Sequence, residues 1–471
     1  MGSNPEPTPP PPGFRIIPCT GVDLSLRREM APMGLVINAR LDPSRMETTL
    51  WTLMEHKFPR AGSRVACRNG VYELQIPETF DSQNPPFVFT VRNHPGLYQR
   101  DGRPELPLGL TGLKPCMIPD PELACLFQTP TCPRSLDDFI QSNVPSVHIH
   151  ITVFDDFTFL GFIAPHIVID GIGIATLLHA WTELLRGDDI DTIQGMEWDA
   201  QPLAPFSSGP VTSDAPRGFL RPSAAALGSQ KVQESMKDES DAKDVPPLRA
   251  CAEGSAEYVG SGDVLSAWWF KTIYGDRRLT DHTPIHIHMV KNLRGMPIFA
   301  NDAPLAEPYI NNLILTIPIP PIPASAFQTE SLAAVALRIR RTILAYNNDL
   351  EAVRADLRWR CAGSGSNNGQ GLLMCPPGAE WAFQTDLRSA KLGELDFSGA
   401  VIGKNAPKTA PVQVVFVYLF MCTEPPFAFR EGLAVVMEDA EAVWMSATRG
   451  EKEWEKIKQA GEIEFTDSRL L

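Results

Sequence analysis

The 471-residue sequence lacks an apolar run of the ~20 residues that a membrane-spanning helix needs. It also lacks positive charge: 42 Lys and Arg stand against 56 Asp and Glu, giving a net charge of -14. With no long basic block either, a nucleic-acid-binding surface is not expected. The polar, proline-rich residues 1–12 have neither the basic start nor the apolar core of a secretory signal. We therefore expect a cytoplasmic protein without a membrane span.

Recognisable metal and disulfide patterns are missing as well. The nine cysteines are scattered and form no Cys-x-x-Cys pair, which argues against a disulfide framework and against structural zinc. His148 and His150, like His286 and His288, are spaced to share one face of a strand, but no carboxylate or cysteine completes a zinc signature. The sequence contains no G-x-S-x-G motif, so a serine hydrolase is not indicated. No metal site is expected.

The composition is that of a globular protein, with 43% hydrophobic and 21% charged residues, and the length allows two domains. Residues 1–13 read as a disordered tail and residues 14–205 as a first domain. Residues 206–250 are rich in Ser, Ala, Pro and Gly, which is typical of a linker. Residues 251–471 then form a second domain.

The most informative stretch combines two strands, a loop and a helix. Residues 147–153 alternate between apolar and polar side chains, and residues 157–163 are an apolar run, which together predict a β-hairpin. The loop that follows carries His166, Asp170 and Gly171. After it, apolar residues recur at helical spacing until Arg186 and Gly187, a basic last turn followed by a C-terminal glycine.

His166 in such a loop is suited to general-base catalysis, because its pKa is near neutrality and its ring nitrogens can meet a substrate hydroxyl. Asp170 would hold the loop in shape. A structural interpretation remains open at this point: Asp170 is well placed to cap the helix that begins at Gly171, and His166 could be a half-buried histidine without a catalytic role.

Two motifs carry a resemblance to a known family. The segment Ala164-Pro165-His166-Ile167-Val168-Ile169-Asp170-Gly171 and its surroundings resemble the HxxxDG region of the BAHD acyltransferases, which are CoA-dependent. Downstream, Leu395-Asp396-Phe397-Ser398-Gly399-Ala400 is similar to the family's D-F-G-W-G motif, with Ser, Gly and Ala replacing its last three residues. The long crossover and the altered second motif are more similar to fungal secondary-metabolite O-acetyltransferases than to plant members.

The resemblance implies an α/β fold. Two similar chloramphenicol-acetyltransferase-like domains, each a mixed β-sheet with flanking helices, would face each other around a solvent tunnel. Residues 14–205 would be the N-terminal acyltransferase domain, residues 206–250 the crossover linker and residues 251–471 the C-terminal acyltransferase domain.

The resemblance also implies an activity, namely transfer of an acyl group from acetyl-CoA or another acyl-CoA to a hydroxyl of a small-molecule alcohol. His166 would be the general base and Asp170 would orient its loop. Gly171 would avoid crowding where the chain turns into the helix, and Arg294 and Asp396 would form a structural salt bridge. Acyl-CoA is a co-substrate, so no permanently bound cofactor is expected. Residues that contact CoA are not assigned, and a monomer is expected.

Three alternatives remain on the sequence. The same fold and histidine could serve a CoA-independent proton transfer, such as elimination or cyclisation. The chain could also be a non-catalytic binder of small molecules. A condensation domain acting on carrier-bound thioesters is disfavoured, because Pro165 stands where such domains usually have a first histidine. The acceptor, the acyl chain length and the regiochemistry are not readable from the sequence.

Overall fold

The computed structural model describes residues 11–98, 103–104, 106, 108, 115–120, 122–207, 235–240, 249–252, 255–362, 375–376, 379–402, 412–420, 431–439, 442–461 and 463–465. Most of the predicted tail lies outside these ranges, and the first strand begins at Phe14. Among the described residues, no helix has both the length and the apolar character needed to span a membrane.

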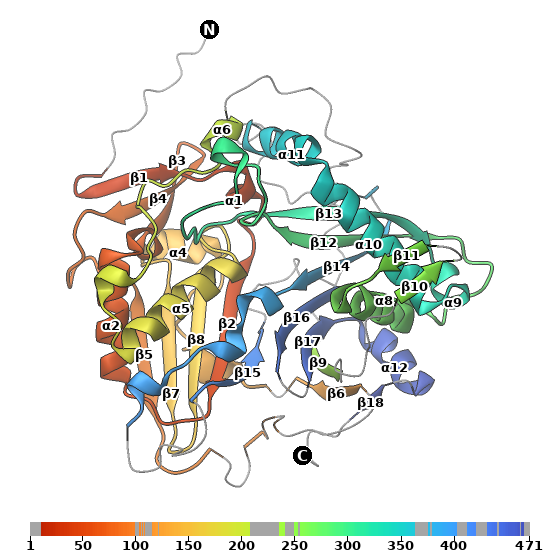
Figure 1. Ribbon diagram of the computed structural model, residues 1–471. Coiled ribbons are helices and arrows are strands. Elements are labelled where there is room, and N and C mark those ends of the chain that lie inside the picture. Colours follow the sequence, from red (N-terminus) through yellow and green to blue (C-terminus); the bar gives the residue numbers. More distant parts are fainter. Residues whose placement is uncertain are drawn as a thin grey trace.

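A five-stranded mixed sheet forms the centre of the first lobe (Figure 1). Its β5 and β7 are parallel and the other neighbours antiparallel. The order is β15 (Val414–Tyr418), β2 (Met30–Ile37), β8 (Thr158–Pro165), β7 (His148–Val153) and β5 (Val88–Asn93). Every residue of β7 and β8 is buried, which fits the nearly continuous apolar run of β8, whereas β7 buries His148, His150 and Thr152 as well.

Helices cover this sheet, and α2 and α5 lie beside each other over it (Figure 1). They are α2 (Pro43–His56), α3 (Ala124–Phe127), α4 (Leu136–Ser142) and α5 (Gly171–Arg186). The hairpin and helix predicted around His166 are therefore present, as β7, β8 and α5. Next to this lobe lie α1 (Gly21–Ser25), α6 (Ala204–Ser207) and a three-stranded antiparallel sheet of β1 (Phe14–Pro18), β4 (Val71–Pro77) and β3 (Arg64–Arg68).

The second lobe has an eight-stranded mixed sheet. Its order is β13 (Ile314–Pro323), β12 (Pro284–Asn292), β14 (Glu380–Asp386), β16 (Gly432–Glu438), β17 (Val443–Thr448), β9 (Ser235–Ser240), β6 (Cys116–Pro119) and β18 (Glu464–Phe465). Its helices are α8 (Ser261–Tyr274), α9 (Ala326–Thr329), α10 (Leu332–Asn348), α11 (Leu350–Ala362) and α12 (Glu451–Ala460). A hairpin of β10 (Arg249–Ala252) and β11 (Ser255–Tyr258) lies beside α10.

Two mixed sheets with flanking helices confirm the predicted α/β fold class, while the solvent tunnel stays a prediction. The two lobes exchange strands, however. β15 comes from the C-terminal half but pairs with β2, and β6 comes from the N-terminal half but pairs with β9. Because β9 falls within residues 206–250, that segment is not merely a linker. Composition could not reveal this, since a strand's partner is chosen by the assembled sheet.

Candidate active site

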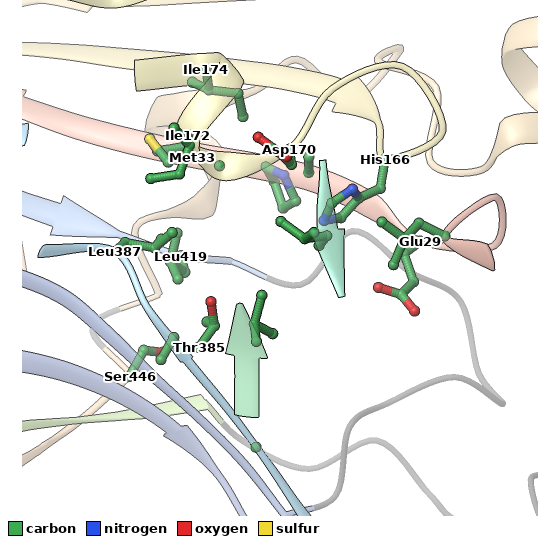
Figure 2. Close-up of a pocket in the computed structure, with 18 of the residues that line it drawn as sticks. Glu29, Met33, His166, Asp170, Ile172, Ile174, Thr385, Leu387, Leu419 and Ser446 are labelled. Carbon is green, nitrogen blue, oxygen red and sulfur yellow. The ribbon is translucent and has the colours of Figure 1, made fainter. Parts of the chain in front are cut away.

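His166 lies in the turn immediately after β8, at the end of a central strand of the first sheet. Its backbone N–H donates to the carbonyl of Glu29 at 2.8 Å. This bond ties the turn to the segment that precedes β2, and the side chain faces a pocket between the two lobes (Figure 2).

The pocket has a volume of about 270 Å³ and is mostly apolar. This volume is just below the range of roughly 300 to 1,000 Å³ that is common for drug-sized ligands, which suits a compact molecule. Met30, Met33, Ile172 and Ile174 line it from the first lobe. The second lobe contributes Val290, Ile314, Phe383 and Leu433, together with the hydroxyl groups of Thr385, Ser446 and Thr448.

Asn312 fixes the orientation and the protonation of the His166 ring. Its amide nitrogen donates to the carbonyl of His166 at 2.7 Å and to a carboxylate oxygen of Asp23 at 3.1 Å. With the nitrogen so engaged, the amide oxygen is the atom that lies 3.1 Å from Nδ1 of His166. An amide oxygen only accepts, so Nδ1 carries the proton and Nε2 keeps its lone pair.

The electrostatics favour a neutral imidazole. Burial lowers the pKa of His166 from its ordinary value of 6.5, and this effect outweighs the opposing influence of its own backbone, of Asp170 and of Asn312. A histidine that is neutral at pH 7 with a free Nε2 can accept a proton.

Asp170 combines two structural roles. Its Oδ1 accepts from the backbone of Gly173 at 2.8 Å, which caps α5. Both carboxylate oxygens also accept from the guanidinium of Arg294, at 2.9 and 3.0 Å, and Oδ2 accepts from the backbone of Leu313 at 3.0 Å. The carboxylate therefore shapes the loop through protein contacts, and the capping role considered from the sequence is one part of its function.

The predicted salt bridge between Arg294 and Asp396 is wrong. Besides Asp170, the Arg294 guanidinium contacts the carbonyls of Tyr309 and Asn311, and Asn292. Asp396 instead accepts from the backbone of Ser398 at 2.9 Å. The sequence allowed either carboxylate, and packing decided between them.

The second motif lies at the opposite end of α5. A Cβ atom on Gly399 would lie 1.9 Å from the carbonyl oxygen of Leu185, at the C-terminal end of this 16-residue helix. At 1.5 Å per residue the helix separates the motif from Arg294 by roughly 24 Å. The contact also explains the departure from the D-F-G-W-G pattern, because no side chain fits at this position. Phe397 is buried against Trp181.

Gly171 also lies in a confined place. A Cβ atom there would come within 2.8 Å of a terminal methyl of Leu387, which lines the pocket from the second lobe. A larger residue at this position would have to displace that side chain. The glycine thus permits a close approach between the helix that follows the His166 loop and the opposite wall of the pocket.

The two histidine pairs singled out from the sequence lie on strands β7 and β12. His150 contacts the Thr90 hydroxyl at 2.7 Å, and burial lowers the pKa of His148 and of His150 to about 4. No three His, Cys, Asp or Glu side chains in the described ranges are arranged to hold a metal ion. Lys404 and Lys408, two cations that follow the second motif in the sequence, lie outside those ranges, and contacts to CoA stay unassigned.

Asn312, which contacts the His166 ring, and Glu29, which lines the pocket, were not identified as site residues from the sequence. Asn312 is the second residue of an Asn-Asn doublet shortly before β13. The doublet was a weak signal for Asn312, since polar residues before an apolar strand are common. Glu29 gave no signal, because its place beside His166 follows from strand pairing between β2 and β8.

Curated relatives cover most of the chain. No protein-family model matches it. It is 25% identical over 454 residues to the acetyltransferase adrJ of Penicillium roqueforti, covering 89% of each chain. It is also 23% identical over 487 residues to a protein of Penicillium decumbens named the transcriptional regulator calD, covering 97% of each. The O-acyltransferase pboC of Aspergillus ustus is 24% identical over 448 residues, which is 89% of this chain and 92% of that one.

Solved structures share the fold. The TRI101 structure from F. sporotrichioides, complexed with coenzyme A and T-2, has a TM-score of 0.66 at 15% identity and covers 95% of this chain and 98% of its own. Vinorine synthase has a TM-score of 0.59 at 15% identity and covers 95% and 93%. The shared fold, the HxxxDG loop at the pocket and the relatives named acetyltransferase and O-acyltransferase together support the resemblance of this chain to the BAHD acyltransferases.

Proposed function

We propose that this protein transfers an acyl group, with acetyl the default, from acyl-CoA to a hydroxyl of a secondary metabolite, and that His166 is the general base. The observation that carries the proposal is the contact of Nδ1 with Asn312, which leaves the lone pair of Nε2 available in the pocket. Relatives named acetyltransferase and O-acyltransferase support the reaction type.

The proposed mechanism needs no covalent acyl-enzyme. Nε2 of His166 takes the proton of the acceptor hydroxyl while its oxygen attacks the thioester carbonyl. The tetrahedral intermediate then collapses, the carbon–sulfur bond breaks, and the imidazolium returns the proton to the departing sulfur. Negative charge on the former carbonyl oxygen needs a hydrogen-bond donor. Hydroxyls on the facing wall, of which Thr385 and Ser446 are labelled in Figure 2, are suitable donors.

Similar solved structures support acyl-CoA as the donor. The TRI101 structure contains coenzyme A, and its fold is shared along nearly the whole chain. Asp386 in the pocket wall is held by Arg388 at 2.7 Å, so this carboxylate is compensated where an anionic donor would approach. We therefore extend CoA dependence to this chain as part of the proposal.

The first test is release of free thiol from acetyl-CoA with water as a surrogate acceptor. We expect slow enzyme-dependent release of thiol from the wild type. In His166→Ala the rate should be at least about 100-fold lower, because general-base catalysis accelerates a reaction by a factor of roughly 10² to 10⁴. The matched control is His56→Ala on the exposed end of α2, which should keep wild-type activity. The rate should fall on the acid side only below pH 6.5, since burial lowers the His166 pKa.

An active His166→Ala variant that is folded would contradict the assigned base. If the wild type released no thiol and acetyl-CoA failed to raise its melting temperature, CoA dependence would be refuted. The CoA-independent proton transfer considered from the sequence would then become the better hypothesis.

A further inference from the structure

Glu29 occupies a second polar position beside His166. It directly precedes β2, and its backbone carbonyl accepts from the backbone of His166 at 2.8 Å. This hydrogen bond fixes the backbone of Glu29 against the turn that carries His166. Its carboxyl group points into the pocket on the same side as the His166 ring (Figure 2).

No group of the described part of the chain neutralises this carboxyl group. Within the described residues its side chain makes no hydrogen bond or ion pair, and no Lys or Arg is among the described residues that line the pocket. The other two acidic residues that line the pocket each form an ion pair, Asp170 with Arg294 and Asp386 with Arg388. His166 is the remaining titratable neighbour, and burial keeps it neutral.

The surroundings favour the protonated form of Glu29. The residue is half-buried, and burial raises its pKa from 4.5 to about 8. At neutral pH the group is then mainly a carboxylic acid, which has an O–H donor and a carbonyl acceptor. Leaving such a group without a partner in an apolar pocket is unfavourable, so it should bond to a ligand.

The proposed reaction does not require this group, since His166 both removes and returns the proton. We propose that Glu29 is a specificity-determining residue, which holds a second oxygen atom of the acceptor while the reacting hydroxyl faces His166. This inference rests on the proposed function and narrows its substrate. The acceptor would be a compact, neutral, mostly apolar alcohol with a further hydroxyl or carbonyl oxygen.

One test needs no ligand. The pKa of Glu29 is 4.5 in the unfolded chain and about 8 in the folded chain. Between these two pH values the folded state therefore binds more protons than the unfolded state. Its contribution to stability is complete below pH 4.5 and is lost as the pH rises through 8. Glu29→Gln keeps the shape without the charge. We expect its melting temperature to match the wild type near pH 5 and to exceed it increasingly up to pH 9.

Glu47→Gln on the exposed face of α2 is the matched control, and its difference from the wild type should not depend on pH. A pH-independent difference for Glu29→Gln as well would overturn the assignment of a buried, protonated carboxyl group.

The second test uses decalin-1,5-diol and decalin-1-ol as probes that differ in one oxygen. Measured by thermal shift at pH 7, the diol should bind the wild type about tenfold more tightly than the mono-ol, the effect of one buried hydrogen bond. Glu29→Gln, which still donates, should keep this preference. Glu29→Leu, which cannot donate, should lose it.

Equal binding of the two probes to the wild type, including no binding of either, would overturn the proposal. A decalin amino alcohol that binds more tightly than the diol, with the advantage lost in Glu29→Gln, would overturn it too, because Glu29 would then be an anion that pairs with an ammonium group. Neither test requires acyl transfer. Thiol release with His166→Ala therefore tests the proposed function separately.

Discussion

The partner of His166 is a neutral amide, although a carboxylate lies four residues away. A carboxylate against Nδ1 would raise the pKa of the imidazole, whereas an amide oxygen orients the ring with little effect on its charge. Asp170 is instead neutralised by Arg294. His166 is therefore held in the correct tautomer while burial keeps its pKa below 6.5.

We expect Asn312→Ala to lower kcat by about 100-fold with little change in KM, because the ring loses its orientation and its fixed tautomer while the pocket walls remain. Asn311→Ala is the matched control. Asn311 is equally buried and bonds to Val168 and Arg60, but does not touch the His166 ring. Steady-state kinetics with melting curves for both variants would check this. Equal losses of kcat in the two folded variants would contradict a specific role for Asn312.

At the scale of elements, the N-terminal end of α5 joins three segments of chain. Asp170 caps the helix, Arg294 follows β12, and the carbonyls of Tyr309 and Asn311 precede β13. Asp170 is almost fully buried and Arg294 largely so, at 2% and 13% side-chain exposure. Such a pair contributes through geometry, since each partner would be an uncompensated charge without the other.

The same substitution at two aspartates distinguishes this ion pair from the one expected by resemblance. Asp170→Asn should lower the free energy of unfolding by about 3 to 5 kcal/mol, because it leaves Arg294 buried without its counter-charge. Asp396→Asn should cost less than about 1 kcal/mol, since asparagine can still accept from Ser398. Urea denaturation of both variants measures the difference. Comparable losses would support the Arg294–Asp396 pair instead.

The opposite end of α5 is set by close packing. The backbone at Gly399 approaches the Leu185 carbonyl so closely that a side chain is excluded, and Phe397 fills the space against Trp181. No residue of the second motif is among the described residues that line the pocket. The motif therefore supports the helix that positions the His166 loop.

For the whole molecule, the strand exchange makes the lobes interdependent. The pocket takes residues from both, and β15 covers the edge of β2 in the first sheet. Without β15, the buried Leu35, Val36 and Ile37 would belong to an open, apolar edge strand.

We therefore predict that residues 14–205 expressed alone show no cooperative thermal unfolding by circular dichroism. Co-expression with residues 206–471 should restore one cooperative transition, because both sheets are then complete. The intact chain provides the reference curve. A fragment 14–205 that melts cooperatively by itself would show that the exchanged strand is dispensable.

The sequence by itself determined what depends on neighbouring residues. Alternation and helical spacing predicted the hairpin and α5, and the turn with His166 followed from where those patterns end. Asp170 as the cap of α5 was also a local feature, since a cap and its helix are adjacent in the chain. The resemblance in two motifs then supplied the fold class.

Tertiary structure alone decided the partners of these residues. Asn312 lies 146 positions from His166, and Arg294 lies 124 positions from Asp170. Several carboxylates and amides in the sequence were equally suitable chemically, and the exchange of β15 and β6 between sheets has no local pattern. Hydrogen bonds and ion pairs act only over short distances, and many groups in the sequence could form them. Only the packing of distant segments therefore selects which of these groups meet.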